Sequence, residues 1–138
     1  MAGIDAKEQV LGRLCTHVAK RLLSGEEITI VNAEKVRISG SRAQLLEHYA
    51  QRRHRGKNMS GPNYPRSADM IFKRTVRGML DYRKTTGKEA YKRLKVYVGI
   101  PSELSGIRHE SPDAGLKPRL ARYVYLEEIS RELGSRRT

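Results

Sequence analysis

The chain has 138 residues, of which 38% are hydrophobic and 31% are charged, enough apolar content for one domain with its own core. Lysine and arginine outnumber aspartate and glutamate by 28 to 15, and the net charge of +13 favours a polyanionic partner, with nucleic acid as the leading class. No apolar run approaches the roughly 20 residues of a membrane-spanning helix, no signal peptide is recognisable, and a single cysteine, Cys15, excludes an internal disulfide. We predict one cytoplasmic domain over residues 1–138.

The first part of the chain predicts two helices and two strands. Apolar residues recur in pairs every four residues over 10–24, which is typical of one face of an amphipathic helix. Residues 28–32 are rich in β-branched side chains and predict a buried strand, and a shorter strand is expected at 36–38. A second helix is expected over 42–53, with Ser41 beginning a capping-box pattern at its N-terminus.

A basic loop and a third helix occupy the middle of the chain. Residues 54–66 contain two glycines and two prolines and lack periodicity, so they predict a long loop of the kind that is usually functional or disordered. The third helix is expected to start after Ser67, its N-cap. Its predicted inward-facing residues are Ile71, Phe72, Val76, Met79 and Leu80. Its predicted outward-facing cations are Lys73, Arg74 and Arg77.

The last part of the chain alternates helical and extended patterns. We expect, in order, a short helix at 88–94, a strand at 95–99, an irregular excursion at 101–119, a strand at 122–126, a helix at 126–133 and a short basic tail at 135–138. Because helices and strands alternate along the chain, the sequence predicts an α/β sandwich with a largely parallel sheet.

The positive charge is concentrated between Arg52 and Lys95. These 44 residues contain fourteen Lys/Arg and three acidic residues, a net charge of +11, whereas the other 94 residues net only +2. A charged run is often a solvated face, but such faces usually mix both signs, so contact with a polyanion is the favoured interpretation. Within the loop, His54 can contact phosphate or base, and Tyr64 either stacks on an unpaired base or packs ahead of the third helix.

The sequence lacks the patterns of catalytic, metal and cofactor sites. It contains neither the G-x-G-x-x-G nor the P-loop pattern of nucleotide-binding proteins. Its four scattered histidines and one cysteine do not match the ligand spacing of structural zinc. Cys15 lies on the apolar face of the first helix and is interpreted as a core residue, and the carboxylates are not spaced for a shared metal ion. We therefore expect no enzymatic activity, metal, cofactor or small-molecule substrate.

Several motifs resemble those of one known family. They are Val-Leu-Gly-Arg-Leu at 10–14, Val-Asn-Ala-Glu at 31–34, Ile-Phe-Lys-Arg-Thr-Val-Arg-Gly-Met-Leu at 71–80, Gly-Lys at 87–88 and Leu-Lys-Val-Tyr-Val-Gly at 94–99. In this combination and spacing, the chain resembles the L-thirteen family of large-ribosomal-subunit proteins over residues 5–101, in the branch found in archaea and eukaryotes. One departure is Asp81, which stands where the family usually has proline.

The resemblance implies a three-layer α/β/α fold that binds large-subunit ribosomal RNA, supports subunit assembly and contacts neighbouring ribosomal proteins in the cytoplasmic ribosome. It implies no enzymatic activity. Together with the basic stretch, it predicts these RNA-binding residues: Arg52, Arg53, His54, Arg55, Lys57, Asn58, Tyr64, Arg66, Lys73, Arg74, Arg77, Arg83, Lys84 and Lys88. Two alternatives stay open: a free-standing RNA- or DNA-binding regulator of similar fold, and an RNA-processing enzyme.

Overall fold

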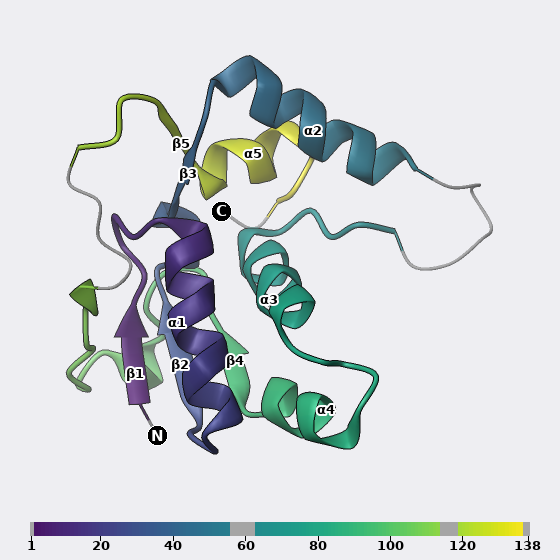
Figure 1. The fold of residues 1–138 in the computed structure, drawn as a ribbon. Helices are drawn as coiled ribbons and strands as arrows, with labels where there is room; N and C mark the ends of the chain where they lie inside the picture. The colour runs from purple at the N-terminus through teal and green to yellow at the C-terminus, as the bar shows by residue number, and fades with distance from the viewer. Residues whose placement is uncertain (1, 56–62, 114–118, 137–138) are drawn as a thin grey trace.

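A computed structural model describes residues 2–55, 63–113 and 119–136 of the chain. Its strands are β1 (Ala2–Asp5), β2 (Ile28–Val31), β3 (Arg37–Ser39), β4 (Leu94–Val96) and β5 (Tyr123–Tyr125). Its helices are α1 (Leu11–Leu23), α2 (Arg42–His54), α3 (Ala68–Met79), α4 (Thr85–Lys92) and α5 (Leu126–Glu132), with 3₁₀ turns at Ala33–Lys35 and Ser102–Leu104. Figure 1 shows their arrangement, which confirms the predicted α/β sandwich.

The larger sheet is parallel, as predicted. Its strand order is β1-β2-β4, and its register places Ile4 beside Ile30 and Ile30 beside Val96, so these side chains share one face. β3 and β5 form a separate antiparallel pair, in which Ile38 lies opposite Val124. The sequence does not predict β1, because its four residues include a single strong strand former, Ile4, next to glycine.

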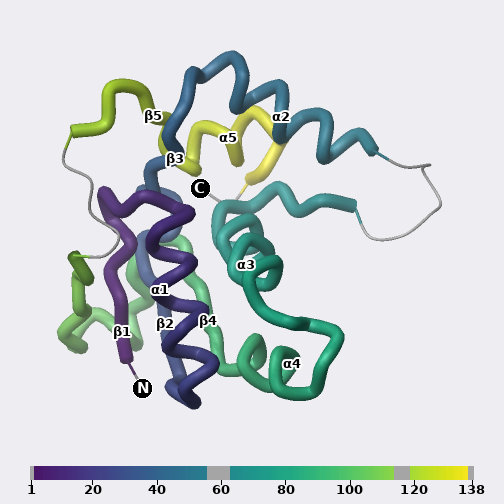
Figure 2. Tube along the Cα trace, viewed as in Figure 1, coloured from purple at the N-terminus to yellow at the C-terminus, as the bar shows by residue number. Residues whose placement is uncertain are grey.

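Helix α1 forms the centre of the core. In Figure 1 it stands in front of the parallel sheet, and it packs against α3 and α4, while α3 also packs against β4. Helices α2 and α5 pack against each other near the β3–β5 pair, as the Cα trace in Figure 2 also shows. Leu14, Val18 and Leu22 of α1 and Phe72 of α3 are fully buried, and each such side chain contributes about 1.5–3 kcal/mol of burial free energy.

The segment that follows β4 returns to the edge of β1. The ring of His109 lies against Gly3, where an added Cβ atom would come within 2.6 Å of its Nδ1. The N–H of Glu110 donates to the Gly3 carbonyl, and the Glu110 carbonyl accepts from the N–H of Asp5, both at 2.8 Å. The described part of the predicted excursion at 101–119 is therefore anchored to the sheet.

Two apolar residues that the sequence predicts on inward faces are exposed. Met79 is 41% exposed and Leu23 is 56% exposed. Both lie at the C-terminal ends of their helices, where the adjacent residues Leu80 and Leu22 take the buried positions. Neighbouring residues on a helix are rotated by about 100° from each other, and at these two helix ends only one of each pair is buried, whereas Ile71 and Phe72 within α3 are both fully buried.

The packing of α4 depends on Gly87. Helix α4 begins at Thr85, three residues earlier than predicted, and ends before β4. Gly87 is buried, and a Cβ atom at this position would overlap the backbone carbonyl of Asp81. That carbonyl accepts a hydrogen bond from the N–H of Lys84 at 3.1 Å. The missing side chain at position 87 therefore lets α4 lie directly on the turn that connects it to α3.

Cys15 lies in the core, as predicted. Its side chain is fully buried, and burial raises the pKa of the thiol well above its usual range. We expect a thiol reagent to label the native chain at least about 100-fold more slowly than the unfolded chain, because labelling requires a large opening of the structure. Mass spectrometry over time measures the rate. A variant with Cys15→Ala and Leu23→Cys, which moves the thiol to an exposed position, should label fast; equally fast labelling of native Cys15 would contradict its burial.

Candidate nucleic-acid interface

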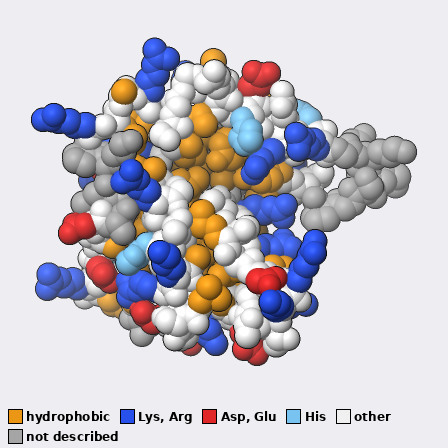
Figure 3. Space-filling view, in the orientation of Figure 1, with side chains coloured by type: hydrophobic (Ala, Val, Ile, Leu, Met, Phe, Trp, Pro, Cys, Tyr) orange, Lys and Arg blue, Asp and Glu red, His pale blue; other side chains and the backbone are white. Residues whose placement is uncertain are grey.

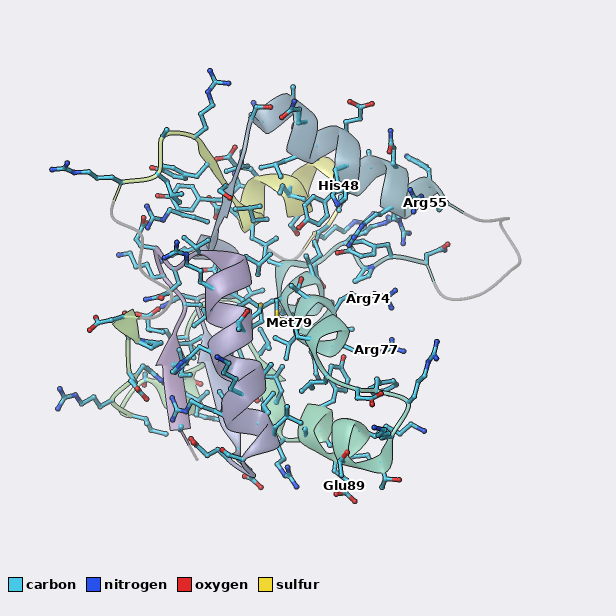
Figure 4. All side chains as sticks on the ribbon, in the orientation of Figure 1. His48, Arg55, Arg74, Arg77, Met79 and Glu89 are labelled. Atoms are coloured by element: carbon cyan, nitrogen blue, oxygen red, sulfur yellow. The ribbon has the colours of Figure 1, made fainter. Side chains whose placement is uncertain are left out.

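Cations from separate parts of the chain point to one side of the molecule. The last turn of α2 contains Arg52, Arg53 and His54. Figure 4 shows Arg55, which follows α2, and Arg74 and Arg77, which project from α3, all extending away from the sheet. The fold therefore brings together two parts of the basic stretch that are about twenty residues apart in sequence.

The apolar spacing of α3 determines which of its residues face outward. Ile71, Phe72 and Val76 are fully buried against α1 and the rest of the core. Of the three cations predicted to face outward, Arg74 is exposed, whereas Lys73 and Arg77 are half-buried. Ser67 occupies the N-cap position as predicted, although its side chain makes no capping hydrogen bond.

Tyr64 packs just before α3 and contacts arginines of both α2 and α3. Its carbonyl oxygen accepts a hydrogen bond from Arg53 Nη1 at 2.6 Å. The guanidinium carbons of Arg52 and Arg74 lie 5.6 and 5.9 Å from its ring centroid, and the ring of Tyr49 lies 6.1 Å away. The packing alternative for Tyr64 is therefore observed, whereas base stacking stays a prediction. Arg53 has a structural partner within the chain.

A second aromatic pair positions the other two cations of α3. The guanidinium carbon of Arg77 lies 4.1 Å from the ring centroid of Tyr82, and Lys73 Nζ lies 5.0 Å from that of Tyr91. The two tyrosine rings meet edge to face at 5.4 Å. Such contacts engage the face of a guanidinium, and its N–H groups point outward from the edge, where a phosphate can accept them.

A hollow of about 680 Å³ opens between the end of α2 and α3. Its described lining includes Arg52, Arg55 and Arg74 together with Tyr64, and no acidic residue is among these lining residues. Figure 3 shows blue arginine and lysine side chains on this side of the molecule, around an orange apolar area. We use the term basic surface for the set Arg52, Arg55, Tyr64, Lys73, Arg74 and Arg77.

The remaining predicted residues lie around or apart from the basic surface. Arg66, Arg83, Lys84 and Lys88 are exposed before α3, in the α3–α4 turn and on α4. Lys84 pairs with Asp81 at 3.3 Å, so part of its charge is compensated. His54 is exposed at the end of α2. Lys57 and Asn58 lie outside the described residues.

Carboxylates do not gather within residues 2–55, 63–113 and 119–136. No group of three or more His, Cys, Asp or Glu side chains in these ranges is placed to hold a metal ion. Asp69 lies in the first turn of α3, where the helix dipole favours its charge, and Figure 4 shows Glu89 on the side of α4 away from Arg77.

Within residues 2–55, 63–113 and 119–136, no helix has both the length and the apolar character needed to cross a bilayer.

Sequence reasoning missed two cationic or titratable residues beside the basic surface. Arg13 of α1 and His48 of α2 line a second hollow, which Arg52 also lines. Arg13 is recognisable as a polar-face residue of the first helix. Its position next to α2 depends on how the helices pack over a long sequence separation, and no local pattern reports this.

Burial of Tyr49 predicts a loss of stability in alkaline solution. Burial raises the pKa of Tyr49 to about 12, above the ordinary value of about 10. Between these two pH values the unfolded chain loses a proton that the folded chain keeps, so the free energy of unfolding falls as the pH rises. Urea unfolding at pH 9, 10 and 11 should show a shallower fall for Tyr49→Phe than for the unchanged chain. An equal fall in the free energy of unfolding for both proteins would show that Tyr49 is not the cause of the loss.

Comparison with known proteins identifies relatives of the chain. Residues 1–103 match the family model described as "Ribosomal protein L13". The "Large ribosomal subunit protein uL13" of Methanococcoides burtonii is 49% identical over 99% of both chains, and that of Methanosarcina barkeri is 49% identical over 99% of both. The protein of the same name from Archaeoglobus fulgidus is 46% identical over 96% of this chain and 87% of its own length. These names are those of a ribosomal component and not of an enzyme, in agreement with the sequence prediction. The chain therefore belongs to the L13 family of large-ribosomal-subunit proteins.

Proposed function

We propose that the chain binds large-subunit ribosomal RNA through the basic surface and supports assembly of the subunit. The observation that carries the proposal is the convergence of Arg52, Arg55 and Arg74 on one hollow with no acidic residue in its described lining. Arginine presents a planar fork of N–H donors that matches phosphate oxygens in pairs. Several guanidinium groups at one place therefore suit a point where phosphates of the RNA backbone come close together.

The aromatic contacts of the basic surface favour RNA binding by ordering the cations in advance. Arg77 and Lys73 lie over tyrosine rings, and Arg52 and Arg74 flank the ring of Tyr64. Immobilising a long side chain on binding costs about 0.5–1.5 kcal/mol. Part of this cost is already met in the free protein. The α/β core thus acts as a rigid platform for phosphate contacts.

Salt dependence tests the electrostatic basis of the proposal. With about six to ten phosphate contacts, affinity for RNA should fall about 10³-fold to 10⁵-fold between 50 and 200 mM salt, on the calibration for duplex DNA. Filter binding of purified large-subunit ribosomal RNA over this salt range measures the slope. Binding that hardly changes with salt would contradict a phosphate-dominated interface.

Fractionation separates a ribosomal role from that of a free-standing regulator. A tagged copy expressed in an archaeal cell is expected to sediment with large subunits and to remain there after a moderate-salt wash, because it is held by ribosomal RNA and by neighbouring large-subunit proteins. A mainly free pool would instead favour the regulator. The proposal places the chain in the cytoplasmic ribosome.

A further inference from the structure

Two adjoining hollows lie between α1, α2 and α3. The hollow beside the basic surface adjoins a second one of about 550 Å³, whose lining includes Gly12, Arg13 and His48. Arg52 and Thr75 line both hollows, so the two lie side by side and together make one hollowed strip of surface. We call it the three-helix groove. It extends the basic surface to α1, which lies outside the basic stretch of the sequence.

The three-helix groove has a cationic rim and an apolar, partly aromatic floor. The arginines in its lining are Arg13, Arg52, Arg55 and Arg74. The aromatic and apolar residues in its lining include Leu11, Tyr49, Tyr64 and Met79. No acidic residue is among the described lining residues of either hollow. Such a lining suits a ligand that has both negative charge and a flat apolar face, as a nucleotide with an unpaired base does.

Two glycines in the groove have no packing reason within the described chain. Gly12 lies in α1 and Gly78 in α3, and a Cβ atom at either would meet nothing within 4 Å. Glycine is the least favourable residue of a helix after proline, and Gly87, in contrast, is required by a close backbone contact. The Thr16 hydroxyl donates to the Gly12 carbonyl at 2.9 Å and lies 3.7 Å from the sulfur of Met79. The start of α1 and the end of α3 are therefore neighbours.

We propose that the three-helix groove binds a single-stranded segment of RNA. An unpaired base lies on the floor near Tyr64 and Met79, and the sugar–phosphate backbone passes close to Gly12 and Gly78, where no side chain blocks it. Single strands expose bases that stack on aromatic and arginine side chains, whereas a duplex keeps its bases stacked inside. The inference rests on the proposed RNA binding and deepens it, because it names the form of RNA and adds residues of α1.

The test fills the groove without changing its charge. Gly12→Gln and Gly78→Gln introduce a good helix former at each site, and Gly106→Gln, at a position that also has open space but lies outside the groove, is the matched control. Affinity of the full chain is measured by filter binding to purified large-subunit ribosomal RNA, to poly(U) and to a poly(A)·poly(U) duplex. Thermal unfolding is measured in parallel.

We expect each groove variant to bind ribosomal RNA and poly(U) at least about tenfold more weakly than the unchanged chain. Its binding to the duplex should be unchanged, and its thermal midpoint should be no lower. The Gly106→Gln control should bind all three RNAs like the unchanged chain. Equal loss on the duplex would overturn the single-strand assignment, and unchanged binding to ribosomal RNA and poly(U) would overturn the groove while leaving the basic surface intact. Failure of the unchanged chain to bind ribosomal RNA would overturn the proposed function as well.

Discussion

A variant with both Arg74→Glu and Arg77→Glu is expected to bind large-subunit ribosomal RNA about 100-fold to 10,000-fold more weakly than the unchanged chain. Each arginine that meets a phosphate contributes a charge-assisted hydrogen bond worth about 1.5–3 kcal/mol, and each glutamate adds repulsion. Every 1.4 kcal/mol corresponds to a factor of ten in affinity. Filter binding at fixed salt measures the change.

The fold of this double variant should stay intact. Arg74 is exposed and Arg77 lies over Tyr82 at the surface, so the loss is about 0.5–1 kcal/mol of cation–π energy. The matched control is Lys7→Glu with Arg108→Glu, which changes the net charge by the same amount at exposed positions away from the basic surface. An equal loss of binding in the control would show that only net charge matters. Loss of the circular-dichroism signal in the Arg74→Glu, Arg77→Glu variant would show that these two residues do not lie on the outer face of α3.

Gly87→Ala is expected to destabilise the chain by about 3 kcal/mol or more. A single added carbon overlaps the carbonyl of Asp81, which is backbone and cannot rotate away as a side chain would. Overpacking typically costs about 1–3 kcal/mol, and more where the neighbour cannot move. Relief requires that α4 shift from the turn holding Lys84 and from the Tyr82–Tyr91 contact.

Thermal unfolding measures this loss, which should appear as a fall of about 10 °C in the midpoint. Gly78→Ala adds the same carbon in α3, where it meets nothing within 4 Å. It should leave the midpoint unchanged or raise it slightly, because alanine favours the helix. If Gly87→Ala behaved like Gly78→Ala, the close contact between α4 and the α3–α4 turn would be disproved.

The helices are predictable from sequence where a periodic apolar stripe faces a large core. The stripe over α1 predicts that helix to within one residue at each end, and Ser67 with the stripe after it predicts the start of α3. The start of α4 is not predictable, because it depends on Gly87 fitting against a carbonyl six residues earlier. Strands are predicted at 36–38 and 122–126, where β3 and β5 form, but their antiparallel pairing and the strand β1 depend on partners far away in sequence and are not predicted.

The charge of the candidate site is visible in sequence, but its geometry is not. The distribution of charged residues along the sequence locates the basic stretch, and the helical period separates Arg74 from the buried Ile71 and Val76. That Arg53 is engaged by the Tyr64 carbonyl, and that Arg13 of α1 joins the same groove, follows only from tertiary packing. A local pattern therefore identifies which residues carry charge and leaves open which of them share a surface.

A density map of the assembled large subunit that contains this chain tests the central claim most directly. The proposed function predicts ribosomal RNA phosphates within hydrogen-bonding distance of Arg52, Arg74 and Arg77. The opposite result is a basic surface that faces solvent or another protein, with RNA bound elsewhere on the chain. That result would contradict the assignment of ribosomal RNA binding to this side of the molecule.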